Sequence, residues 1–305
     1  MRSSFSSPSL VQRIAVATGV AVPFVGCVVA IVLMWFHGWM GWLYLALLVG
    51  GWLITGLGVT VGLHRLLTHR SFETHSWVRA FWAALGATAA QGPPLTWCAT
   101  HRKHHDLSDQ PGDPHSPHRY GDGCWNAIRG LFHSHVGWVF SNHTNDSMLE
   151  RYVPDLRKDW LLVGIERSYV LWVFIGLSIP ALIGLLVAGG WQGAFLGFLW
   201  GGLVRVFFVH HVTWSINSIC HTFGSFDYAC ADQSRNNFVC GVLGHGEGWH
   251  NNHHAFPNSA RHGLRWWQFD LSWLVIRTMK FSRVAWNIRT PSQNALEAKR
   301  LAGNH

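Results

Sequence analysis

Four long stretches almost free of charged side chains constrain the fold of this chain most. They are residues 14–36, 41–63, 168–188 and 191–213, and Arg205 is the one Asp, Glu, Lys or Arg residue within them. About 20 apolar residues are enough for a helix to cross a bilayer. The links between the first two and the last two stretches are short, so the stretches pair as two hairpins. We therefore expect an all-α integral membrane protein with four transmembrane helices.

The basic residues predict the orientation of these helices. All 23 Lys and Arg residues lie before residue 14, between residues 64 and 167, or from Arg205 onward. Cytoplasmic loops hold the excess of basic residues in membrane proteins. We therefore expect both termini and a helical cap, residues 64–167 and 214–305, on the cytoplasmic side, as in a bacterial inner membrane. The net charge of +8 is then a topology signal, and we expect no nucleic-acid partner.

The rest of the chain does not suggest a second domain. Only 12% of the residues are charged, against about 25% in soluble domains, so we expect one membrane-bound domain over residues 1–305. A cleaved signal peptide is the alternative for residues 14–36, but that apolar stretch is too long and no small-residue cleavage site follows it. Two shorter apolar segments, residues 77–95 and 264–288, are expected to lie at the membrane surface or pack beneath the site.

Histidine clusters are the strongest functional signal. Histidine makes up 21 of 305 residues, and the pattern HxxHH should occur by chance about 0.1 times in such a chain, yet it occurs twice. The clustered histidines are His64 and His69; His101, His104 and His105; His250, His253 and His254; and the separate His221. Spacings of three and four place each triplet on one helical face. His64 and His69, five apart, do not share a face on an ideal α-helix, so they lie at a helix end or serve a site that the helix wraps.

This pattern predicts a metal site rather than a histidine-rich surface or core. Neutral imidazole is the commonest protein ligand for metals, and nine histidines are too many for one ion, which favours two. No carboxylate lies within a cluster, which argues against a carboxylate-bridged site of the Glu-x-x-His type. Imidazole ligands suit iron, zinc, copper or nickel, so the residues alone leave the metal open.

Several longer motifs carry a resemblance to a known family. They are residues 62–71 (GLHRLLTHRS), 113–115 (DPH), 246–257 (GEGWHNNHHAFP) and 259–263 (SARHG). Over residues 52–291 the chain resembles the membrane-bound fatty acyl desaturases, in their Δ9 (stearoyl-type) branch and closest to bacterial and cyanobacterial members. The resemblance implies an oxygen-dependent enzyme that introduces a cis Δ9 double bond into a saturated acyl chain, carried as acyl-CoA or as a membrane-lipid ester. It also implies electrons from a ferredoxin or a b-type cytochrome with its reductase.

The resemblance further implies two Fe²⁺ ions and a division of the ligands between them. One ion would be held by His64, His69, His105 and His254, with Asn217 reaching it through a water. The other would be held by His101, His104, His221, His250 and His253. The same resemblance gives no ligand role to His75, His210, His211 and His245. Zinc is expected to replace iron in purified protein, because imidazole sites bind it more tightly than ferrous iron.

Six residues are expected to bind the acyl chain. By resemblance, Gln91, Trp97 and Thr213 form the bend of a substrate tunnel, Trp214 lies beside it, and Trp52 and Gly56 lie near its closed end. Trp52 would be the floor of the tunnel, and Gly56 the gap that lets the methyl end reach it. The alternative for Trp52 and Gly56 is ordinary helix packing, with the glycine admitting a neighbouring helix.

The chain departs from the animal acyl-CoA enzymes of this family at the headgroup. Basic or acidic residues that contact CoA there are replaced by Ala99, Thr100, Asn142 and His143, so a lipid-linked acyl chain rivals acyl-CoA. Two other functions remain alternatives. A sibling hydroxylase, alkane hydroxylase or carotenoid ketolase would insert oxygen instead of removing hydrogen. A metal transporter is disfavoured, because its ligands should lie near the middle of the membrane.

Overall fold

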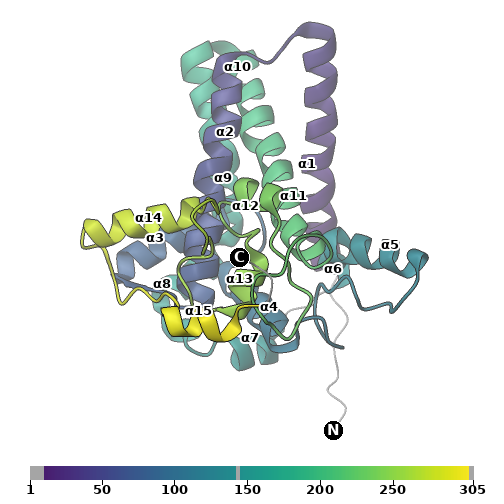
Figure 1. Cartoon of the computed structure of the whole chain (residues 1–305). Helices are drawn as coiled ribbons and strands as arrows, with labels where there is room; N and C mark the ends of the chain where they lie inside the picture. Colours follow the sequence, from purple (N-terminus) through teal and green to yellow (C-terminus); the bar gives the residue numbers. More distant parts are fainter. Residues whose placement is uncertain (1–9, 142–144, 302–305) are drawn as a thin grey trace.

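The computed structural model describes residues 10–141 and 145–301. Four helices within these ranges are long and apolar enough to cross a membrane: Leu10–His37, Trp42–Thr68, Tyr169–Ala188 and Gly190–Ser218. They cover the four stretches expected from the sequence except residues 41 and 168, and the second and fourth extend several residues past the end of the expected stretch. Figure 1 shows these helices standing together in the upper part of the molecule, with the shorter helices gathered below them. Asn142 and His143 lie outside the described residues.

Two of the long helices change their winding partway along. The first and third long helices, α1 (Leu10–His37) and α9 (Tyr169–Ala188), are α-helical throughout. The second continues from α2 (Trp42–Leu57) into the π-helix η1 (Gly58–Thr68). The fourth runs through α10 (Gly190–Gly197), the π-helix η4 (Phe198–Val204) and α11 (Arg205–Ser218). A π-helix is rare and often marks a functional site, because it shifts the register of the side chains that follow.

Small residues and one buried arginine hold the long helices together. A Cβ on Gly184 of α9 would collide with the carbonyl of Gly193 of α10, so only glycine allows this close approach. Arg205 faces the interior, with 1% of its surface exposed. It donates hydrogen bonds to the carbonyls of Thr88 and Gly176, each at 2.9 Å.

The remaining elements form the lower part of the molecule. The helices are α3 (Ser76–Ala87), α4 (Pro94–Leu107), α5 (Cys124–Phe132), η2 (His133–Gly137), α6 (Trp138–Ser141), α7 (Asp146–Tyr152), η3 (Leu156–Lys158), α8 (Trp160–Arg167), α12 (Phe238–Leu243), α13 (His250–Ala255), α14 (Leu271–Phe281) and α15 (Gln293–Lys299). Two short strands, β1 (Glu73–Thr74) and β2 (Ala285–Trp286), pair antiparallel. The main core includes Leu63, Leu67 and Ala83 and reaches Ile276 of α14.

The two short apolar segments are helical and are apolar on their outer faces. In residues 77–95 the helix stops at Ala87 and a new one starts at Pro94, which suits the first position of a helix. The α3 helix packs on η1 but leaves Trp77 and Phe81 more than half exposed. In α14, Leu274 and Phe281 are exposed while Ile276 is buried.

Candidate metal centre

The π-helix η1 explains the five-residue spacing of the first histidine pair. In this winding each N–H bonds to the carbonyl five residues earlier, and the N–H of His69 donates to the carbonyl of His64 at 3.1 Å. Residues five apart therefore come together, and the Nε2 atoms of His64 and His69 lie 3.1 Å apart. A regular α-helix would not bring these two imidazoles together.

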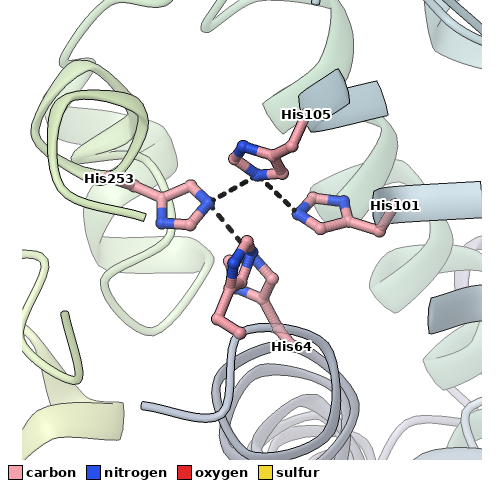
Figure 2. A group of neighbouring side chains, drawn as sticks. His64, His101, His105 and His253 are labelled. Atoms are coloured by element: carbon pink, nitrogen blue, oxygen red, sulfur yellow. Dashed lines mark hydrogen bonds between the residues drawn. The ribbon is translucent and has the colours of Figure 1, made fainter. Parts of the chain in front are cut away.

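The two triplets lie on short helices that face each other across the site. His101, His104 and His105 are on α4, and His250, His253 and His254 are on α13. His221 follows the end of α11, and its Nε2 lies 3.1 Å from Nε2 of His250. Figure 2 shows His64, His101, His105 and His253 pointing toward one another; His64 comes from η1, His101 and His105 from α4, and His253 from α13.

The nine histidines form two groups. Within each group, one ring nitrogen of every histidine lies within 4.8 Å of those of the others. One group is His64, His69, His101, His105 and His253; the other is His104, His221, His250 and His254. The structure groups these ligands differently from the division that the resemblance implies, because it keeps His101 with His105 and His250 with His254. Residues four apart on a helix share a face, so each of these pairs stays together. The middle histidine of each triplet, His104 or His253, belongs to the other group.

Carboxylates hold four of the imidazoles from behind. Nδ1 of His104 lies 3.0 Å from both oxygens of Asp113, Nδ1 of His221 lies 2.9 Å from Asp109, and Nδ1 of His254 lies 2.6 Å from Asp232. Nδ1 of His64 lies 2.6 Å from Oε2 of Glu247. Ionised carboxylates can only accept a hydrogen bond, so Nδ1 of His104, His221 and His254 carries the proton. The lone pair on Nε2 then points into the site.

The protonation states agree with this arrangement. Burial, reinforced by the neighbouring imidazoles, lowers the pKa values of His69, His101 and His253 well below the usual range. Burial also lowers the pKa of His254 to about 4. For Asp232, burial opposes ionisation, but the hydrogen bond from His254 outweighs it and lowers the pKa. His254 and Asp232 are therefore a neutral imidazole donating to a carboxylate.

His221 differs from the other ligating candidates. Burial would lower its pKa, but the hydrogen bond to Asp109 and the charge of that carboxylate outweigh the burial and raise it. The carboxylates of Asp109 and Asp113 both have pKa values below the usual range, because their histidine partners overcome the effect of burial. Each carboxylate therefore stays ionised behind its imidazole.

These residues fit a pair of metal ions. The Nε2 atoms of His104 and His254 are buried and have no hydrogen-bond partner among the described residues. In the larger group, neighbouring Nε2 atoms lie 2.9 to 3.2 Å apart. Two nitrogens bound to one metal at about 2.1 Å lie about 3.0–3.4 Å apart. Lone pairs converging at this spacing repel one another unless a cation lies between them, and the outer carboxylates are the usual partners of metal-bound histidine.

Sequence reasoning missed the group around Glu247. Glu247 lies in the GEGWHNNHH motif, whose outline was recognised, but the motif gives no sign of what this carboxylate touches. It contacts His64, His262 and the fully buried Arg65, whose Nε donates to it at 3.1 Å. Arg65 also donates to Asp270 at 3.1 Å. Burial would raise the pKa of Glu247, but His64 and Arg65 overcome it and lower the pKa.

A cavity runs from the histidines along the second long helix. Its volume is about 560 Å³, including the open mouth, and His64, His101, His250 and Asn217 line it near the metal groups. The other lining residues are Trp52, Gly56, Val59, Thr60, Trp97, Val209, Val212, Thr213, Ile216, Gly244, His245 and Glu247. Gly56 precedes His64 by eight residues, or about 12 Å at about 1.5 Å per residue.

The residues expected to bend the tunnel are joined by hydrogen bonds. Nε2 of Gln91 donates to Thr213 at 2.8 Å, and its Oε1 accepts from Nε1 of Trp97 at 3.3 Å. Trp97 and Thr213 line the cavity, while Gln91 links them from outside the lining. Trp214 packs on the rings of His210 and His211 and is not among the residues that line the cavity.

The fold and the site together define a class of protein: a helical protein with four helices able to cross a membrane and a histidine site suited to metal. Comparison with known families gives this class a name. Residues 37–289 match the model of the fatty acid desaturase family. The chain belongs to this family and is an acyl desaturase.

The relatives differ in the carrier for which they are named. The chain is 42% identical to a hex-5-enoyl-[acyl-carrier protein] acetylenase of Moorena producens, over 92% of this chain and 87% of that protein. It is 38% identical to an sn-1 stearoyl-lipid 9-desaturase of Anabaena variabilis, over 78% of this chain and 80% of that protein. It is 37% identical to an acyl-CoA C20 Delta5-desaturase of Anemone leveillei, over 77% and 70% respectively.

Proposed function

We propose that this protein is an oxygen-dependent Δ9 desaturase that acts on a saturated acyl chain esterified to a membrane lipid. The observation that carries the proposal is the cavity that begins at both histidine groups and whose lining surface is mostly apolar. A lining of this kind suits an acyl chain, which it would hold against the metal groups. Relatives named as stearoyl-lipid 9-desaturases, at 38% and 36% identity, support the lipid-linked substrate and the Δ9 position.

The nine histidines would hold two Fe²⁺ ions, five at one and four at the other. When bound, the ions would activate dioxygen, the oxidant that removes two hydrogens from adjacent methylenes; with two electrons from the external donor and two protons, the dioxygen would leave as two waters. Asn217 lies one helical turn before His221 and lines the cavity beside His250, so we assign it to the four-histidine group, through a water. The outer carboxylates keep each imidazole in the tautomer that points its lone pair inward.

The protein's other residues would position the substrate. Methylenes in a saturated chain are chemically alike, so only the position of the chain selects the carbon that reacts. The hydrogen bonds that Gln91 donates to Thr213 and accepts from Trp97 fix two of the lining residues, which supports their role at the bend. Trp52 and Gly56 line the cavity farther from the histidines, as a closed end would require.

Of the positions that hold CoA in the animal enzymes, Ala99 and Thr100 offer no contact for it here. Ala99 is fully buried, and Thr100 is 6% exposed, so neither side chain reaches a headgroup in solvent. This favours a lipid ester over acyl-CoA. We further propose that the four long helices form two hairpins, that both termini and the cap are cytoplasmic, and that a ferredoxin or b-type cytochrome there supplies the electrons.

Membranes that contain the protein provide the test of this function. Isotope-labelled stearoyl-CoA and a phospholipid with a labelled stearoyl chain are offered separately, with a reductase, ferredoxin and NADPH. We expect the phospholipid to lose two hydrogens at the Δ9 position and the CoA ester to react slowly. Rapid desaturation of the CoA ester alone contradicts the lipid substrate, and a product that has gained one oxygen identifies a hydroxylase instead.

The metal requires a separate measurement. We expect the His221→Ala protein to bind less metal than the native protein and to lose desaturation, because His221 belongs to the four-histidine group. The His75→Ala protein is the control, because His75 is exposed and belongs to neither group. Protein that carries zinc after purification should be inactive until the zinc is exchanged for iron. Full activity of the zinc form would contradict the di-iron assignment.

A further inference from the structure

His245 occupies a costly position that hydrogen bonding does not explain. It lies between α12 and α13 with φ of 55°, in the left-handed region that favours glycine, and glycines flank it on both sides. Its side chain is 2% exposed, and its Nε2 has no hydrogen-bond partner among the described residues. Backbone strain and an unpaired buried nitrogen both destabilise a fold. A strained residue of this kind suggests a functional constraint.

The imidazole of His245 makes its contacts by packing rather than by hydrogen bonding. Its ring stacks on Trp52, with centroids 4.9 Å apart and planes at 29°. It also fills the space beside Gly56, where an added Cβ would lie 2.8 Å from Nδ1 of His245. Nε1 of Trp52 donates to the carbonyl of Leu243 at 3.2 Å. The indole and the loop that carries His245 are therefore fixed to each other.

These contacts change the role expected of Gly56. The sequence suggested that the missing side chain of Gly56 leaves a gap for the methyl end of the substrate. In the structure the imidazole of His245 fills that gap. All three residues line the cavity, and Trp52 and Gly56 precede His64 on the same long helix by twelve and eight residues. Burial lowers the pKa of His245 to about 4, so its ring is neutral and compatible with an acyl chain.

We propose that His245 is the end wall of the acyl cavity and that, with Trp52, it sets the longest acyl chain that the enzyme accepts. This inference rests on the proposed function, because it assumes that the cavity holds the substrate. The methyl end of the chain would stop against the imidazole. A smaller residue at position 245 would open the space between Gly56 and Trp52 to additional carbons.

Two substitutions at position 245 separate the effect of the ring's volume from a general loss of folding. His245→Gly removes the ring and relieves the strained backbone, so the variant should fold. His245→Phe keeps a ring of similar size but has no ring nitrogen. We expect His245→Gly to raise the use of arachidoyl relative to stearoyl chains about tenfold or more, since one methylene in a pocket changes selectivity by about 10–200-fold. His245→Phe should keep the native ratio.

Binding gives a readout that does not require turnover. Thermal stabilisation of the zinc-loaded protein is measured with saturated methyl esters from lauroyl to arachidoyl. The ester that stabilises most should be longer for His245→Gly than for the native protein or His245→Phe. An unchanged ratio and an unchanged best ester in His245→Gly would overturn the end wall and leave the proposed function intact. If the native protein desaturates no chain while the best ester still shifts, the proposed function fails and the end wall stands.

Discussion

Several of the ligating imidazoles depend on the carboxylate behind them as well as on the metal in front. His254 shows this most clearly, because its Nδ1 lies 2.6 Å from Asp232 and its Nε2 has no partner. We expect Asp232→Asn to weaken metal binding at the four-histidine group about 10–100-fold, because the neutral amide no longer fixes the tautomer of His254. Competition between the protein and a chelator for zinc measures this affinity. Asp106→Asn is the control, since Asp106 is an exposed carboxylate that contacts Arg151 and Tyr152; equal affinities in the two variants would contradict the prediction.

The same residues show what a sequence can and cannot predict at this scale. The histidines were found because spacings of three and four are local and rare by chance. Their outer carboxylates were not, because Asp109 is 112 residues from His221 and Asp232 is 22 residues from His254. Such contacts are made by loops, and no periodicity encodes them. The groups in the structure differ from the division that the resemblance implies, because residues four apart on a helix share a face.

At the scale of single elements, the winding of a helix determines which histidines come together, and η1 is the clearest case. The four long helices could be predicted because each is an uninterrupted apolar stretch long enough to cross a membrane. The π-helix could not be predicted from the α-helical period of 3.6 residues. The five-residue spacing of His64 and His69 was the only feature of the sequence that agreed with it. Two glycines let α3 approach this element: a Cβ on Gly58 would lie 2.6 Å from the backbone nitrogen of Gly86, and one on Gly62 would lie 2.7 Å from the carbonyl of Trp82.

We therefore expect Gly62→Ala to destabilise the protein and disturb metal binding together. The added methyl group must push α3 away from η1, and overpacking of this kind costs about 1–3 kcal/mol. His64 lies two residues later on the same element, so the displacement should also reduce bound iron. Gly50→Ala is the matched control on the same long helix, because nothing lies within 4 Å of its Cβ. Thermal unfolding in detergent and iron analysis compare the two variants, and equal behaviour would show that α3 adjusts freely.

Across the whole molecule, Arg65 joins the second long helix to the segments around the metal site. It is fully buried, and it donates to the carbonyl of Ala260 at 2.7 Å as well as to Glu247 and Asp270. We expect Arg65→Met to lower the free energy of unfolding by about 3–5 kcal/mol, because it leaves two buried carboxylates without their cation. Arg157→Met, which breaks a surface pair with Glu150, should cost about 0–1 kcal/mol. Thermal melts in one detergent measure both, and similar losses would mean that water reaches the site around Arg65.

The orientation of the molecule in its membrane is a prediction from charge alone, and two cysteines can test it. Cys124 in α5 is exposed, and Trp191, which is 86% exposed, follows the link between α9 and α10. Figure 1 shows α10 at the top of the molecule and α5 at the lower right, among the short helices. We expect a membrane-impermeant maleimide applied to intact cells to label Trp191→Cys in a Cys124→Ser background. The native Cys124 should react only after the membrane is opened. The reverse order would place the histidines outside the cell, out of reach of a soluble cytoplasmic electron donor, and would contradict both the topology and the source of electrons proposed for this enzyme.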